Sequence, residues 1–263
     1  PYDHFEAGHS STSISVANGF AIARDLNKEN YNIIAFIGDS SIPNGLSFEA
    51  LNNVGANNHK VIIVLNDNNM SISKPVGGFA KAFRKFSTSG VYLQSKNIFT
   101  KLFNLSKLGK KLLRKLTRVK NWLKKKVLNI TIFDTLGYTV IGPVDGHYIK
   151  QMDKAFAKAK KIKNSVVVYI KTIKGKGYKF AEKDVTGEWH GVSKFDVNTG
   201  EMINKNACAT WSEQYNCILK DEMRINPKII TIAPATEHGS QLDSLFKNFP
   251  DRTIDVGISE EHA

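Results

Sequence analysis

Short, continuously apolar runs recur along the chain and are typical of strands buried on both faces of a parallel sheet. Amphipathic helical patterns fill several of the intervals between them. The expected strands cover residues 33–37, 61–65, 138–141, 166–170 and 229–233, and the clearest helices cover 11–26, 45–55 and 151–162. This alternation predicts an α/β fold with a largely parallel sheet and helices on both of its faces.

A polar, turn-rich stretch without periodicity, residues 190–210, indicates a domain boundary. After it come a helical pattern around 210–223 and the last expected strand. We therefore expect a first domain over residues 1–200 and the start of a second α/β domain over 201–263. The chain opens without an initiating methionine and stops directly after an apparent strand, so we expect a piece of a longer protein that lacks both ends.

Two of the expected strands end in acidic and amide side chains. The first runs into "GDSS", which contains Asp39, and the second into "NDN", which ends at Asn68. A right-handed crossover through the intervening helix would place both turns at one sheet edge, where ligands of open parallel sheets bind. Carboxylate and amide oxygens suit Mg²⁺, and the small Ser40 and Ser41 let backbone N–H groups approach phosphate oxygens. The pair predicts a magnesium diphosphate site, although such residues also populate ordinary turns.

The net charge of +13 is concentrated in one segment. Between Lys96 and Leu128 twelve residues are Lys or Arg and none is Asp or Glu, so the remainder is almost neutral. This distribution argues against a general nucleic-acid-binding domain. Leucines and valines at steps of three and four predict an amphipathic helical insertion over 96–128, with solvated lysines. A membrane-surface helix and a nucleic-acid patch are the alternatives.

The remaining composition indicates a cytoplasmic protein. No apolar run approaches the roughly 20 residues of a membrane span, and the chain does not open with a signal peptide. Cys208 and Cys217 fit neither a redox pair nor a zinc motif, and we expect both to be buried as small apolar residues.

Four stretches, in this order, resemble the 1-deoxy-D-xylulose-5-phosphate synthase family: "GHSSTSIS", "LNDNNMSIS", "IGPVDGH" and "DVGISEEHA". The resemblance runs from residue 3 to the last residue and is loosest at Lys96–Leu128. It implies thiamine diphosphate and Mg²⁺ as cofactors, pyruvate and D-glyceraldehyde 3-phosphate as substrates, and a homodimer when the protein is full length. It also implies that this chain is inactive by itself.

The resemblance assigns roles to individual residues. Asp39, Asn68 and the backbone carbonyl of Met70 match the magnesium ligands. Glu260 matches the catalytic carboxylate that hydrogen-bonds the aminopyrimidine ring of the cofactor, and His190 matches a histidine that faces the substrate. The remaining residues that match cofactor contacts are Gly8, His9, Ser10, Ser40, Ser41, Lys174 and Tyr178.

Several of these residues have structural interpretations as well. The sequence by itself favours His9 as a cap contact for the helix that follows it. Tyr178 has the character of a core aromatic with its hydroxyl at the rim. Lys174 fits a solvated loop. His147 fits a turn residue that caps the helix at 151 as well as it fits a ligand contact, and the same two interpretations apply to Asp145.

Two other functions stay open at this point. One is a related transketolase-like transferase that uses a ketose donor. The other is a non-catalytic protein that binds a membrane or a nucleic acid through the basic segment, its cofactor site having decayed at Ser40. The family usually has glycine and alanine where this chain has Ser40 and Ser41, and serine fits there only if the backbone avoids positive φ.

Overall fold

The computed structural model describes residues 3–68, 132–184, 187–203 and 209–263. The expected basic helix at 96–128, the carbonyl of Met70 and Cys208 lie outside these residues, so the predictions made for them stay predictions. Among the described residues, no helix has the length and apolar character needed to cross a bilayer.

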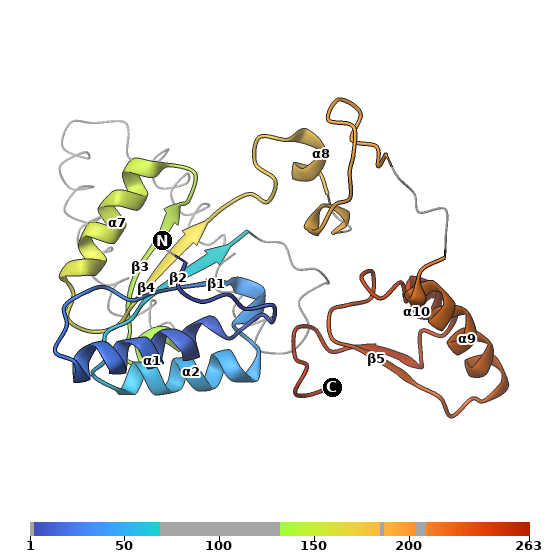
Figure 1. The fold of residues 1–263 in the computed structure, drawn as a ribbon, viewed down its shortest axis with the longest axis horizontal. Helices are drawn as coiled ribbons and strands as arrows, with labels where there is room; N and C mark the ends of the chain where they lie inside the picture. The colour runs from blue at the N-terminus through green and yellow to red at the C-terminus, as the bar shows by residue number, and fades with distance from the viewer. Residues whose placement is uncertain (1–2, 69–131, 185–186, 204–208) are drawn as a thin grey trace, which may run out of the picture.

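Four parallel strands form the main sheet, in the spatial order β1-β2-β4-β3 (Figure 1). They are β1 (Ile34–Gly38), β2 (Ile62–Asp67), β3 (Thr139–Asp145) and β4 (Val166–Lys171). Their apolar, largely β-branched sequences favour strands, and each overlaps its predicted range. β1 and β2 pair directly, with Gly38 opposite Asn66, so the two turns lie at one edge of the sheet as predicted.

Helices cover both faces of this sheet, as the pattern predicts (Figure 1). One face carries α1 (Ser13–Leu26), α2 (Gly45–Ala56) and the short α6 (Ile132–Thr135), and the other carries α7 (Ile149–Lys161). In β2, Ile63 and Leu65 are buried in the first core, and Ile62 and Val64 are buried in the second. The continuous apolar run of β2 therefore reflects a strand covered on both faces.

β1 departs from the prediction of strands buried on both faces. Its side chains alternate: Ala35 and Ile37 are buried, whereas Ile34 is 54% and Phe36 60% exposed. The strand register places Phe36 beside Val64, on the side of the sheet that α7 covers. α7 packs mainly on β3 and β4, away from β1, so among the described elements it leaves this face of β1 open.

α2 approaches the turn between α6 and β3 very closely. A Cβ atom on Gly55 would lie 2.0 Å from the carbonyl oxygen of Leu136, too close for the backbone to stay where it is. Gly137, in the same turn, has a φ of +95°, which glycine adopts without strain. The buried Tyr138 hydroxyl donates a 2.8 Å hydrogen bond to the carbonyl oxygen of Leu51, and burial raises the pKa of Tyr138. Small residues thus allow α2 to pack directly on the start of β3.

A small aromatic unit follows β4. It contains the short helical turns α8 (Lys179–Glu182) and η2 (Glu188–His190). Four rings pack at its centre in tilted and edge-on pairs, with centroids between 4.9 and 5.7 Å apart: Tyr178, Phe180, Trp189 and Phe195. Such geometries are favourable between aromatic rings, and the cluster stabilises a segment with little regular structure.

The C-terminal part has the α/β character that its pattern predicts (Figure 1). The strands β5 (Thr231–Ala233) and β6 (Thr253–Asp255) pair in parallel, and α9 (Trp211–Ile225) and α10 (Asp243–Asn248) accompany them. Met223 and Leu245 are fully buried in its core. The domain boundary within residues 190–210 stays a prediction.

The prediction that both cysteines are buried is wrong for Cys217, which is exposed on α9. The inner face of this helix includes Leu219 and Met223. Positions two residues apart lie on opposite sides of a helix, so Cys217 faces away from the core. Its place on the helix decides its exposure, which the residue type does not reveal.

Candidate active site

Asp39 stands directly after β1, in the short 3₁₀ turn η1 (Asp39–Ser41). Its carboxylate accepts hydrogen bonds from its own backbone N–H and from those of Ser40 and Asn68. Burial, together with the charge of Asp67, raises the pKa of Asp39 to about 6. The structure therefore brings Asp39 and Asn68 together, as predicted, in a place with an excess of negative charge.

Ser40 and Ser41 fit this turn without strain. Both lie in right-handed η1, and neither has a positive φ. The condition under which serine can replace glycine and alanine here is met, so this departure from the family pattern leaves the turn intact.

The other side chains at the end of β2 are bonded to β4. The Tyr169 hydroxyl donates a short hydrogen bond to the Asp67 carboxylate, and the ammonium of Lys171 lies 4.0 Å from it. The Thr172 hydroxyl donates to the amide oxygen of Asn66 at 2.8 Å. Asn66 and Asp67 thus fix the ends of β2 and β4 relative to each other.

The loop before α1 is bonded to both η1 and α2. Ser11 is buried with a φ of +74°, an uncommon conformation for serine. Its hydroxyl donates to the carbonyl oxygen of Ser41 at 3.4 Å, and its own carbonyl oxygen accepts a 3.1 Å hydrogen bond from the Ser47 hydroxyl. These bonds hold residues 8–10 beside the turn after β1.

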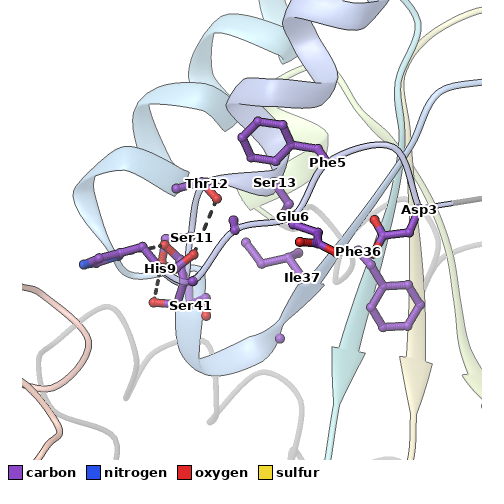
Figure 2. Close-up of a pocket in the computed structure, with 14 residues that line it drawn as sticks. Asp3, Phe5, Glu6, His9, Ser11, Thr12, Ser13, Phe36, Ile37 and Ser41 are labelled. Carbon is purple, nitrogen blue, oxygen red and sulfur yellow. Dashed lines mark hydrogen bonds between the residues drawn. The ribbon is translucent and has the colours of Figure 1, made fainter.

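A pocket with a volume of about 690 Å³ opens between this loop and the end of β1 (Figure 2). Phe5 and Phe36 line an apolar part of it. Four of the predicted cofactor contacts are also among its lining residues: Gly8, His9, Ser10 and Ser41. The pocket therefore combines apolar and hydrogen-bonding surface, as small-molecule sites commonly do.

The prediction that His9 caps the following helix is wrong. α1 begins at Ser13, and its N-cap position is Thr12. The His9 ring points away from the rings of Phe5 and Phe36 (Figure 2), and its Nε2 lies 3.8 Å from Oε1 of Glu260. His9 thus faces the residue that the sequence assigns to the cofactor ring.

Glu260 reaches this place from the opposite end of the chain. Its side chain is 33% exposed, and its Oε2 accepts a 3.4 Å hydrogen bond from the amide of Asn44, the N-cap of α2. Sequence reasoning missed Asn44. An asparagine at a predicted helix start is a recognisable N-cap, but that pattern does not reveal a partner 216 residues away.

Lys174, Tyr178 and His190 form a separate group in the aromatic unit. Nζ of Lys174 lies 3.3 Å from Nδ1 of His190. The Tyr178 hydroxyl donates to the carbonyl oxygen of Val197 at 3.0 Å, and desolvation and the charge of Asp196 raise the pKa of Tyr178. These contacts fit the interpretation of Tyr178 as a core aromatic with a polar rim.

Asp145 and His147 have structural contacts. The Asp145 carboxylate accepts the backbone N–H of His147, and Nε2 of His147 accepts the N–H of Ile173 at 2.8 Å. The imidazole joins the end of β3 to the residues after β4. The N-cap position of α7 is Tyr148, so neither residue caps that helix.

A family profile described as 1-deoxy-D-xylulose-5-phosphate synthase matches residues 1–172. The chain belongs to the 1-deoxy-D-xylulose-5-phosphate synthase family. It is 43% identical to the 1-deoxy-D-xylulose-5-phosphate synthase of Clostridium kluyveri and 41% identical to that of Clostridium acetobutylicum. The protein of the same name from Halalkalibacterium halodurans is 40% identical. Each alignment covers 100% of this chain and 42% of the relative.

The comparisons confirm the family that the four sequence stretches resemble. The chain spans less than half the length of these synthases, and it carries the end of β1, the end of β2 and the C-terminal segment with Glu260 within the aligned part.

Proposed function

We propose that this chain supplies the metal and diphosphate part, and the start of the pyrimidine part, of a thiamine-diphosphate-dependent synthase. The reaction condenses pyruvate with D-glyceraldehyde 3-phosphate to give 1-deoxy-D-xylulose 5-phosphate and carbon dioxide. The observation that carries the proposal is that Asp39 lies beside Asn68 at the end of β1, while Glu260 is bonded to Asn44 at the start of the helix that follows this turn. Family membership favours pyruvate over a ketose as the donor.

The donor set at the sheet edge fits Mg²⁺. Asp39 and Asn68 offer hard oxygen atoms, which this ion prefers, and it commonly keeps water and phosphate oxygens as its other ligands. Burial, and next the charge of Asp67, make ionised Asp39 unfavourable without a cation, as its raised pKa of about 6 indicates. The resemblance adds the carbonyl oxygen of Met70 as a third ligand.

The surrounding residues fit the diphosphate of the cofactor. Ser40 and Ser41 present backbone N–H groups at a turn, and residues 8–10 line the adjoining pocket. When bound, thiamine diphosphate supplies the nucleophilic carbon and the electron sink for decarboxylation. Glu260 is proposed to hydrogen-bond the aminopyrimidine ring and to fix its tautomer.

Lys174 and His190 are proposed to serve the diphosphate and the substrate respectively, with Tyr178 packed beside them. An ammonium group only donates hydrogen bonds, so Nδ1 of His190 accepts from Lys174 and Nε2 carries the proton. The Nε2–H group is then the one available to donate to a substrate oxygen.

A chimera tests the activity, with this chain replacing the homologous part of the Clostridium kluyveri synthase. Mass spectrometry should detect carbon dioxide and 1-deoxy-D-xylulose 5-phosphate only when both substrates, thiamine diphosphate and Mg²⁺ are present. Asp39→Ala should abolish the product. The control Asp25→Asn should retain it, because Asp25 is bonded to His59 ahead of β2 and so lies near the opposite ends of the strands. A folded chimera that binds the cofactor but makes no product would refute the proposal. We also propose that the full-length protein is a cytoplasmic homodimer. Light scattering tests the homodimer, and cell fractionation tests the location.

A further inference from the structure

Asn44 makes two sets of contacts that point in opposite directions. Its side chain is completely buried, and its amide oxygen accepts the backbone N–H of Leu46 at 3.0 Å, as an N-cap does. This contact fixes the orientation of the amide, so the NH₂ group faces the C-terminal segment. There it lies 3.4 Å from the carbonyl oxygen of Ile258, 3.4 Å from Oε2 of Glu260 and 3.2 Å from Oε2 of Glu261.

We propose that Asn44 is a positioning residue that fastens the segment carrying Glu260 to the start of α2. The proposal rests on the proposed function for the role of Glu260, and it adds a residue that none of the assignments above includes. It also explains why an acidic pair lies at this helix end, since the N-terminus of α2 carries a partial positive charge that favours carboxylates.

The number of donors and acceptors refines this role. An amide NH₂ has two hydrogens, and three acceptors lie within reach of it. Glu261 is the nearest acceptor at 3.2 Å, and the carbonyl oxygen of Ile258 and Oε2 of Glu260 share the remaining donor capacity at 3.4 Å each. The second oxygen of Glu260 already faces Nε2 of His9 at 3.8 Å. Asn44 thus holds the segment through three acceptors, while Oε1 of Glu260 stays directed towards His9.

Asparagine can serve both functions at this position because its amide has an acceptor oxygen and a donor NH₂ group. Aspartate caps a helix equally well, but it has no N–H group and would add a third carboxylate beside Glu260 and Glu261. Alanine would remove the cap and the donors together. Asn44→Asp therefore separates fastening of the C-terminal segment from capping of α2.

Hydrogen exchange of the full 263-residue chain, read by mass spectrometry, tests the proposal. Asn44→Asp should raise the exchange of amides in residues 257–263 by about tenfold or more, the usual effect of losing hydrogen bonds to charged groups. Amides of α2 and β2 should stay as protected as in the parent chain. Asn44→Ala is the comparison, and it should loosen α2 as well.

Reversing the polarity of the contact provides the rescue. In Asn44→Asp with Glu261→Gln, the new amide on residue 261 can donate to the new carboxylate on residue 44, so protection of 257–263 should return. Glu261→Gln alone should have a small effect, because its amide oxygen still accepts from Asn44. Unchanged exchange of 257–263 in Asn44→Asp, loosening of α2 in that variant, or no recovery in the double variant would each overturn the proposal.

Titration of the same variants with thiamine diphosphate and Mg²⁺ tests the link to the proposed function. Asn44→Asp should weaken binding, and the double variant should recover it. If the parent chain does not bind the cofactor, the proposed function fails, while the exchange result still decides whether Asn44 fastens the segment.

Discussion

The close approach of α2 to the turn before β3 predicts opposite effects for one substitution made in two neighbouring helices. Gly55→Ala would place a Cβ atom 2.0 Å from the carbonyl oxygen of Leu136 and 3.0 Å from the Tyr138 ring. Gly19→Ala, in the middle of α1, would meet no atom within 4 Å. Both replace a helical glycine, so both gain the same intrinsic preference for alanine.

The magnitudes follow from these surroundings. Replacing a helical glycine by alanine raises the free energy of unfolding by about 0.5–1 kcal/mol, and we expect the full increase at the exposed Gly19. At Gly55 the overpacking cost is about 1–3 kcal/mol and outweighs that gain, because the clashing atom belongs to the backbone. For a chain of this size each kcal/mol shifts Tm by about 2–4 °C. We expect Gly55→Ala to lower Tm and Gly19→Ala to raise it.

Urea denaturation followed by circular dichroism measures both variants against the parent chain. The two midpoints should move in opposite directions with similar slopes, since neither change alters the surface exposed on unfolding much. Equal stabilisation by the two substitutions would show that α2 does not approach Leu136 as the structure has it.

Three further outcomes are expected. Asp39→Asn should weaken the Mg²⁺-dependent binding of thiamine diphosphate, measured by calorimetry. The same substitution should raise the free energy of unfolding of the metal-free chain at pH 7 by on the order of 2 kcal/mol, because it removes a carboxylate whose pKa is raised to about 6. A lower free energy of unfolding would contradict this reasoning. The hydrogen bond from Arg24, and next that from His59, lowers the pKa of Asp25 to about 2, so the stability it contributes should be present above about pH 4 and lost as the pH falls towards 2. Asp25→Asn should reduce the loss of stability between about pH 4 and pH 2 in an acid titration followed by fluorescence. An unchanged titration would show that the ion pair of Asp25 does not cause this loss. In the chimera, Glu260→Gln should retain the cofactor and lose turnover, whereas full turnover would assign the role to another residue.

The strands and their neighbours were predictable because each depends on local sequence and a general rule of connection. The apolar runs specify β1, β2 and β4, and a right-handed crossover then places Asp39 next to Asn68. The same logic does not tell which faces are covered. Phe36 belongs to an apolar run and is still exposed, because α7 packs on β3 and β4 of the same face and does not reach β1.

The unpredicted parts of the site depend on contacts between distant segments. Asn44 and Glu261 are 217 residues apart, and no periodicity or turn pattern connects them. The orientation of His9 depends in the same way on where the C-terminal segment lies. The family resemblance identified His9 and Glu260 but not Asn44, because a resemblance assigns only the positions that match a shared motif.

The open face of β1 also affects how the chain behaves in concentrated solution. β1 is the edge strand of the main sheet within the described residues, and Ile34 and Phe36 project from it into solvent. An exposed edge next to exposed apolar side chains is a template on which another polypeptide can add a strand. Self-association of this chain through β1 should therefore increase with its concentration and should depend on Phe36.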